Sequence, residues 1–285
     1  MGSKSIYATP RAVTNIKECY FYHTMDVPGY GCIEGEWDLR KAAREYLGSV
    51  DFKGKRVLEI GTASGFLCFY MESQGAKVVA YDLSENESWD IVPFSRFDYG
   101  QTVLDVKDHI KRLNNSYWLC HKAYNSSARV VYGSVYDIPE EIGMFDISVF
   151  TAVLPHLRDP FFALQNALRL TREKVIITDV LWRRYFFLQT LVTILSKFGL
   201  RAPLMAFFPN FRTSKRSDTW WMLTPEVIRQ FIGVLGFEES EIKYHFKARR
   251  HGRRRPLYTI VGHKARNTSS TRESNRITSH CGIAP

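Results

Sequence analysis

The chain has 285 residues, of which 45% are hydrophobic, and its formal net charge at pH 7 is +10. This hydrophobic fraction excludes a disordered protein, and the length is sufficient for one large domain with its own core. The five cysteines include no C-x-x-C pair, so we expect neither a metal site nor a disulfide framework. The cysteine pattern, and an N-terminus without the apolar core of a signal peptide, favour a cytoplasmic location.

The N-terminal region is rich in aromatic residues and turns. Residues 1–18 read as a loosely held arm, and 20–31 form an aromatic, turn-rich segment that contains Tyr22 and His23. A helix is plausible from Asp38 to Tyr46, directly after Trp37. We therefore expect this region to lie before the first strand of the main sheet in the chain.

Residues 56–66 read as a buried strand, a tight turn and the start of a helix. The apolar run around Val57 and Leu58 is typical of a parallel strand that is covered on both faces. Gly61 and Gly65 give the turn conformational freedom and leave no Cβ that would hold a ligand away. The backbone N–H groups at the start of the following helix would point back at this turn.

A second strand, residues 77–82, ends in Asp82. A dinucleotide fingerprint would need a glycine where the chain has Ala63, so the pattern is an acid-x-Gly-x-x-x-Gly motif with Glu59 as the acid. An acid about 20 residues beyond the glycines is placed to bind ribose hydroxyls. The alternative is an ordinary turn between strand and helix that binds no ligand.

With this glycine spacing and Asp82, the chain resembles the class I S-adenosylmethionine-dependent methyltransferases. The resemblance implies an α/β fold, with a doubly wound, seven-stranded, mostly parallel sheet of Rossmann-like type. It implies S-adenosylmethionine as the cofactor, with the segment before the first strand as a lid in which Trp37 stacks on adenine or only packs. The residues expected to bind the cofactor are Trp37, Glu59, Gly61, Thr62, Ala63, Gly65, Asp82, Leu83, Ser134, Val135 and Thr151.

Further strands are expected at residues 129–133, 145–151 and 174–180. A loop at 83–98 precedes a helix marked by apolar residues at helical spacing, which serves as a plain crossover or as a wall of the site. Pro160 is well placed to start another helix. The predicted domains are an arm and lid at 1–50, a methyltransferase domain at 51–264 and a disordered tail at 265–285.

An aromatic and helical cap is expected as an insertion at about 182–223. Ligands of open α/β sheets bind beyond the carboxyl ends of the strands, so this insertion would form the roof of a substrate pocket. Its segment 183–211 could instead make peripheral contact with a membrane. A helix follows from Thr224 to Gly236, and then an antiparallel hairpin at 241–247 and 257–263.

The hairpin is joined by a basic run, Lys247 to Arg255. This run could bind the phosphates of RNA or an anionic lipid surface, or it could be a solvated tip. The composition leaves these alternatives open.

Several short motifs narrow the resemblance within the fold. Phe21-Tyr22-His23-Thr24, Glu36-Trp37 and Val153-Leu154-x-His156 are similar to the tRNA wobble-uridine carboxymethyltransferase family and its small-molecule methyltransferase relatives. That family has a tyrosine where this chain has Pro155, and a lysine upstream of the motif tryptophan that is missing from residues 20–23. We therefore predict ordinary S-adenosylmethionine and transfer of a plain methyl group.

Methyl transfer to a hydroxyl needs a base that removes the proton. His156, directly after a strand, is the first candidate, although it could instead shape the turn; Asp179 and His23 are further candidates. The residues expected to bind the substrate are Tyr22, Arg158, Asn210, Arg212, Trp220 and Trp221. The leading hypothesis is methylation of an oxygen of a small molecule, such as a sugar or other metabolite. The alternatives are a tRNA-modifying methyltransferase or carboxymethyltransferase, and a non-catalytic partner subunit that binds the cofactor.

Overall fold

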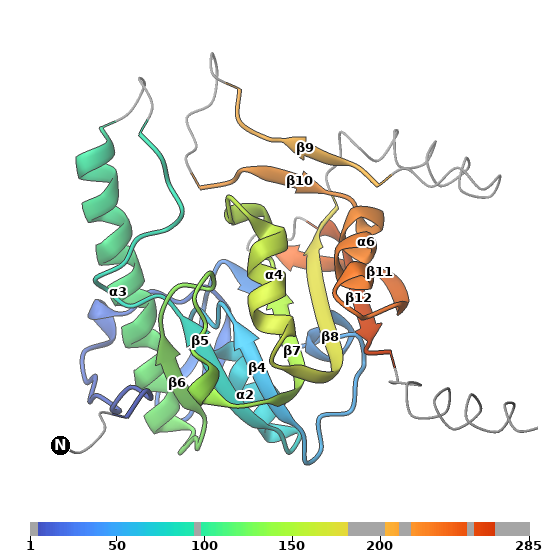
Figure 1. Cartoon of the computed structure of the whole chain (residues 1–285). Coiled ribbons are helices and arrows are strands. Elements are labelled where there is room, and N and C mark those ends of the chain that lie inside the picture. Colours follow the sequence, from blue (N-terminus) through green and yellow to red (C-terminus); the bar gives the residue numbers. More distant parts are fainter. Residues whose placement is uncertain (1–4, 94–97, 182–202, 211–217, 250–253, 266–285) are drawn as a thin grey trace, which may run out of the picture.

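The computed structural model describes residues 5–93, 98–181, 203–210, 218–249 and 254–265. Within these ranges, eight strands form one sheet in the order β3-β11-β12-β8-β7-β4-β5-β6 (Figure 1). The parallel part of this sheet consists of β4 (Arg56–Ile60), β5 (Lys77–Asp82), β6 (Arg129–Tyr132), β7 (Phe145–Thr151) and β8 (Thr171–Val180).

An antiparallel hairpin of β11 (Glu239–Arg249) and β12 (Arg254–His263) completes the predicted seven-stranded sheet, because β12 pairs with β8. The predicted fold class is therefore confirmed. The N-terminal region adds β3 (Trp37–Asp38), which pairs with β11 at Ala248 and Arg249. The prediction that a helix begins at Asp38 was wrong, and α1 covers only Ala43–Tyr46. Asp38 instead pairs with Ala248 at the edge of the sheet, where its backbone polar groups find partners.

Helices cover both faces of the sheet, as a doubly wound fold requires. α2 (Phe66–Ser73) and α3 (Tyr99–Ala123) pack with α1 and the N-terminal region on one face, and α4 (Pro160–Leu168) and α6 (Pro225–Val234) pack on the other. The expected starts at Pro160 and Thr224 are confirmed. Asp159 caps α4 by accepting a hydrogen bond from the N–H of Phe162 at 2.9 Å.

Shorter elements surround this core. They are η1 (Ile16–Glu18), the β1 (Met25–Val27) and β2 (Gly31–Ile33) hairpin, η2 (Glu140–Ile142) and η3 (Leu154–His156). The arm, expected to be loosely held, is attached to the sheet edge in its described part. The N–H of Ala8 donates to the carbonyl of Val130 at 2.8 Å, and the guanidinium of Arg129 lies 3.4 Å from the centre of the Tyr7 ring.

The described part of the cap is an antiparallel hairpin of β9 (Met205–Phe207) and β10 (Trp221–Leu223), which lies beyond the ends of β8 and α4 (Figure 1). The hydroxyl of Tyr258 in β12 donates to the carbonyl of Leu223 at 3.1 Å and so joins the hairpin to the sheet. The helical part of the predicted cap, the segment expected to contact a membrane up to residue 202, Arg212 and the tail from residue 266 lie outside the described residues. Among the helices that are described, none is both long enough and apolar enough to span a lipid bilayer.

Thr178 links α1 to the sheet and provides a test of the packing. Its buried hydroxyl donates to the carbonyl of Tyr46 at 2.6 Å and lies 2.8 Å from the hydroxyl of Thr259. The substitution Thr178→Val keeps the shape but removes the donor, so we expect a loss of about 1–2 kcal/mol in the free energy of unfolding. Urea unfolding measures this loss. The matched variant Thr102→Val, at the exposed start of α3, is expected to change stability by less than about 0.5 kcal/mol.

Candidate functional site

The turn after β4 has the backbone shape that a bound nucleoside requires. Gly61 and Gly65 have φ angles of +76° and +86°, which a side chain would strain. A Cβ on Gly61 would lie 2.6 Å from Cγ2 of Val153, which follows β7. Ala63, between the two glycines, also has a left-handed backbone, with φ of +50°. The turn therefore presents bare backbone at the carboxyl end of the sheet.

The carboxylate of Asp82 holds this turn from the end of β5. It accepts hydrogen bonds from the N–H of Ala63 at 2.9 Å and from the N–H of Leu83 at 2.8 Å. Burial raises the pKa of Asp82 to about 6, while the backbone donors of Ala63 and Leu83 act in the opposite direction. Asp82 is thus mostly ionised at neutral pH, as a residue that accepts from ribose hydroxyls should be.

Glu59, the acid of the motif, is buried inside β4 with only 1% of its surface exposed. Its Oε2 has no hydrogen-bond partner in the part of the chain that the structure describes, and the same holds for the hydroxyl of Thr62. Burial raises the pKa of Glu59 to about 8, and the negative charge of Asp82 adds to the rise; the Thr62 hydroxyl opposes it. Glu59 therefore holds its proton at neutral pH.

Ser134 and Val135 lie in the turn after β6, beside β5. The hydroxyl of Tyr81 donates to the carbonyl of Ser134 at 3.0 Å, and the Ser134 hydroxyl accepts weakly from the N–H of Tyr136 at 3.3 Å. Val135 is buried. The structure thus brings this turn, which was expected to bind the cofactor, to the same end of the sheet as Asp82.

Thr151 ends β7 and is half-buried. The next residue, Ala152, has a left-handed backbone with φ of +56°, and its N–H donates to the carbonyl of Thr178 at 2.7 Å. Strained backbone of this kind is concentrated at functional sites. Sequence reasoning could not predict this conformation, because alanine is not a residue that favours it.

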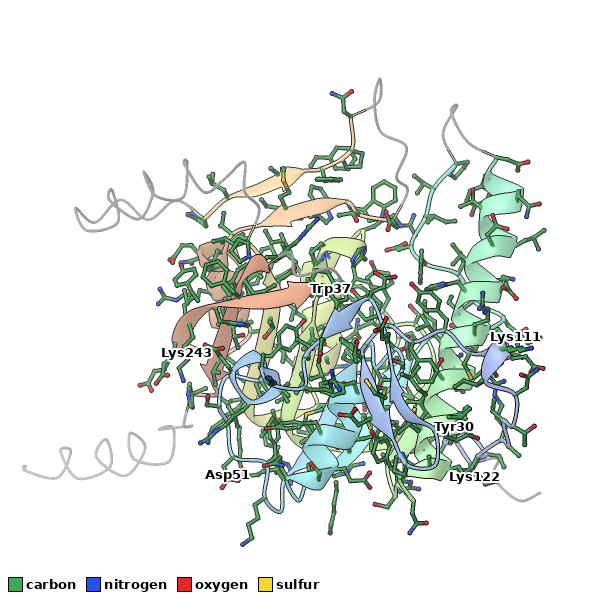
Figure 2. All side chains as sticks on the ribbon, turned by 180° about the vertical axis from the view of Figure 1, so that it is seen from behind. Tyr30, Trp37, Asp51, Lys111, Lys122 and Lys243 are labelled. Carbon is green, nitrogen blue, oxygen red and sulfur yellow. The ribbon has the colours of Figure 1, made fainter. Side chains whose placement is uncertain are left out.

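The lid lies against the start of α2. The N–H of His23 approaches the hydroxyl of Ser64 at 3.4 Å, and the His23 ring lies 5.6 Å from the ring of Phe66. Trp37 is buried, and its backbone N–H donates to the carbonyl of Tyr22 at 3.2 Å. Figure 2 shows Trp37 away from Asp51, which precedes β4. Trp37 pairs with Arg249 at the end of β11, and that end lies beside the start of β12, which pairs with the end of β8. Trp37 therefore lies at the carboxyl end of the parallel strands.

His156, the first candidate base, lies in η3 and is exposed. Its Nδ1 is hydrogen-bonded to the backbone carbonyl of Asp218, and the hydroxyl of Thr219 lies 3.4 Å from the same nitrogen. Because a carbonyl can only accept, Nδ1 must carry the hydrogen. In the neutral ring, Nε2 is then an acceptor, as a general base requires.

Asp179, the second candidate base, is buried at the end of β8. Its carboxylate accepts from the N–H of Val180 at 2.6 Å. It lies opposite Tyr258 in the sheet and also affects Tyr46 electrostatically. Burial raises the pKa of both phenols well above the usual range, and the charge of Asp179 adds to the rise.

Asp90, in the loop after β5, contacts two of the residues predicted to bind the substrate, and sequence reasoning missed it. Its carboxylate accepts from the hydroxyl of Tyr136 at 2.5 Å and from the N–H of Arg158 at 2.7 Å, and it forms an ion pair with the Arg158 guanidinium. Its carbonyl accepts from the indole of Trp220 at 2.6 Å. The indole of Trp221 donates to the carbonyl of Arg158 at 3.0 Å.

Three of the predicted substrate residues, Arg158, Trp220 and Trp221, are thus brought together by Asp90 and its ion-pair partner. Arg158 was expected to orient an anionic substrate, but its guanidinium is paired with Asp90. Asn210 is exposed at the end of a described segment, and Arg212 lies outside the described residues.

The residues present fit S-adenosylmethionine. The turn from Gly61 to Gly65 has a left-handed backbone and no side chain at either glycine, and Asp82 offers an acceptor for ribose. The Oε2 of Glu59 and the hydroxyl of Thr62 are buried polar atoms without a hydrogen-bond partner among the described residues. A cofactor that carries hydroxyl, amino and cationic sulfonium groups matches this donor and acceptor set. We therefore assign these residues to the cofactor as a proposal.

Asp82 gives the first test of the cofactor side. In Asp82→Asn the charged acceptor is lost but the shape is kept, so the affinity for S-adenosylhomocysteine is expected to fall about tenfold to a hundredfold, as for one or two charge-assisted hydrogen bonds. Isothermal titration calorimetry measures this change. Asp51→Asn, at the opposite end of the sheet (Figure 2), is the control and should leave the affinity unchanged. Equal affinities of Asp82→Asn and the wild type would remove Asp82 from the site.

Glu59 gives a test that needs no ligand. Between pH 4.5 and about 8 the native protein binds a proton at Glu59 that the unfolded chain does not. This proton stabilises the native state fully at low pH. As the pH rises through this window, the free energy of unfolding decreases by about 1.4 kcal/mol per pH unit. Urea unfolding of Glu59→Gln should therefore show stability that increases relative to the wild type from pH 5 to 8. Glu141→Gln, at an exposed position, should show no such trend.

Comparison with known proteins agrees with this geometry. The family model described as "Methyltransferase domain" matches residues 36–231, which is more than half of the 285 residues. No curated protein matches the chain by sequence.

Among solved structures, the N-terminal domain of EvdMO1, crystallised in the presence of SAH and D-fucose, is 18% identical and has a TM-score of 0.52. The match covers 86% of this chain and 91% of that chain. The magnesium protoporphyrin IX methyltransferase of Synechocystis PCC 6803, with bound SAH, is 14% identical over 80% of this chain and 82% of its own, with a TM-score of 0.47. At 18% identity the similarity to the EvdMO1 domain shows a shared fold alone. The family match establishes that the chain belongs to the methyltransferase-domain family and is a class I methyltransferase that depends on S-adenosylmethionine.

Proposed function

We propose that this enzyme transfers the methyl group of S-adenosylmethionine to an oxygen of a small molecule, such as a sugar or other metabolite. The observation that supports an oxygen acceptor is the hydrogen bond from Nδ1 of His156 to the carbonyl of Asp218. It fixes the tautomer in which Nε2 accepts a proton, and a hydroxyl is a nucleophile that must lose one.

The contacts of the β9–β10 hairpin, the predicted roof, favour a small molecule as the acceptor. Trp220, directly before β10, is buried and held on two sides: its backbone N–H donates to the carbonyl of Pro155 at 2.8 Å, and its indole donates to the carbonyl of Asp90 at 2.6 Å. The hairpin is thus tied to η3 and to the loop after β5. A roof fixed in this way favours a pocket over an open surface for a polymer.

The proposed mechanism relies mainly on positioning. S-adenosylmethionine, when bound, supplies an activated methyl group on a cationic sulfur. Asp82 would accept from the ribose hydroxyls and fix the nucleoside, and the bare turn at Gly61 would allow close approach. His156 would receive the acceptor's proton at Nε2 while Asp218 keeps the ring oriented. Holding the nucleophile in line can contribute roughly 7–11 kcal/mol to catalysis.

We also place the enzyme in the cytoplasm. Cys19, Cys68 and Cys120 are buried and Cys32 is exposed, and all four are thiols. Burial raises the pKa of the Cys68 thiol well above its usual range, so this cysteine is unreactive. A reducing compartment suits such a set of thiols.

The acceptor class is tested by incubating the enzyme with S-adenosylmethionine labelled in its methyl group and a fractionated cell extract. We expect label in the small-metabolite fraction, bound through an ether or ester oxygen. Label in the RNA fraction would instead support a tRNA-modifying enzyme that uses the segment from Lys247 to Arg255. Label in lipid would support a membrane substrate, and either result would overturn the proposal.

His156→Asn separates catalysis from turn shape. The asparagine amide can keep the hydrogen bond to Asp218 but has no nitrogen that accepts a proton. We expect label transfer to fall by roughly 10²–10⁴-fold, with unchanged affinity for S-adenosylhomocysteine. The control is His263→Gln, at the far end of β12, which should keep full transfer. Full transfer by His156→Asn would limit His156 to shaping the turn.

A further inference from the structure

Glu59 is a buried acid in the cofactor half of the site whose environment lacks a compensating charge. It lies on β4, two residues before Gly61, between Ala80 of β5 and Val149 of β7. Both neighbours are apolar, the side chain is 1% exposed, and its Oε2 makes no hydrogen bond within the described ranges. An acceptor left in this state is costly unless it is protonated or gains a partner.

The titratable groups that face Glu59 come from three elements. They are Asp82 of β5, Cys68 of α2 and Tyr117 of α3, and the Thr62 hydroxyl lies on the turn. None of these groups is a cation. In the protein without ligand, a negative charge on Glu59 would be repelled by the carboxylate of Asp82, and none of these groups carries a positive charge that would offset the repulsion. Burial and Asp82 accordingly raise the pKa of Glu59 to about 8.

The two forms of the cofactor differ in the charge that they bring. S-adenosylmethionine carries a sulfonium, whereas the sulfur of S-adenosylhomocysteine is neutral after the methyl group has left. A positive charge introduced near a buried acid favours the ionised acid. The effect is reciprocal, so an ionised acid increases the affinity for the positively charged ligand.

We propose that Glu59 gives up a proton to solvent when S-adenosylmethionine binds, and that this residue thereby makes the site prefer the cationic cofactor to its neutral-sulfur product. The O–H bond of the carboxylic acid would break and the proton would pass to the buffer, which would leave a carboxylate that the positive charge of the bound cofactor stabilises. After methyl transfer the charge on sulfur is gone, and Glu59 takes up a proton again. The product is then held without this electrostatic contribution, which favours its release.

This inference concerns the cofactor and requires no acceptor, so it stands or falls separately from the oxygen acceptor and from His156. It predicts that the preference for S-adenosylmethionine over S-adenosylhomocysteine increases with pH. Below the pKa of Glu59 the ratio of the two affinities should increase by up to about tenfold per pH unit. Asp82, with a pKa of about 6, contributes little to this change at pH 7 and above.

The experiment is isothermal titration calorimetry with both ligands at pH 7, in phosphate and in Tris, whose ionisation enthalpies differ. We expect S-adenosylmethionine to release up to about one proton more than S-adenosylhomocysteine. In Glu59→Gln this difference should be lost, and only the ligands' own titration should remain. Glu72→Gln, at the end of α2 where Glu72 binds Ser126 and Ser127, is the matched control and should behave as the wild type.

Infrared difference spectroscopy of the wild-type protein gives a second measurement that needs no variant. The carbonyl band of a protonated carboxyl group should disappear when S-adenosylmethionine binds and persist with S-adenosylhomocysteine. Equal proton release by the two ligands, an unchanged difference in Glu59→Gln, or an unchanged infrared band would each overturn the inference. Failure of both ligands to bind would overturn it together with the cofactor assignment.

Discussion

The hydrogen bond from the N–H of Ala63 to the carboxylate of Asp82 is the contact on which the cofactor half of the site depends. It joins the turn after β4 to the end of β5 and holds Ala63 in a left-handed conformation, which costs about 1–2 kcal/mol for a residue with a Cβ. A charge-assisted hydrogen bond is strong enough to offset that cost. The carboxylate that is proposed to bind the ribose is thus also the one that shapes the turn beneath it.

Much of this half could be predicted because its signals are local. The apolar runs of β4, β5 and β7, the spacing of Gly61 and Gly65, and the acid at the end of β5 all lie within short stretches of sequence. β3 could not be found in this way. It has two residues, and Asp38 pairs with Ala248, more than 200 positions away, so its existence depends on the register of a distant hairpin. The local sequence after Trp37 favours a helix, and the sheet edge overrides that preference.

Sequence analysis could select the residues proposed to bind the substrate, but it could not predict which residues they contact. Arg158, Trp220 and Trp221 were predicted to bind the substrate, and each is held through Asp90 or its ion pair. Asp90 lies 68 residues from Arg158 and 130 from Trp220. A single aspartate in a loop carries no motif, and only the folded chain shows that it joins the loop after β5 to the roof. The same contact explains why a cation expected to meet the substrate is neutralised by the protein.

The close approach of Gly61 to Val153 limits how such an enzyme can change during evolution. These residues begin the turns after two neighbouring parallel strands, β4 and β7, and there is no room for even one added methyl group between them. Neither residue can therefore gain bulk without moving the two turns apart. The β9–β10 hairpin forms a sheet of its own, so substitutions in its exposed positions leave this packing unchanged.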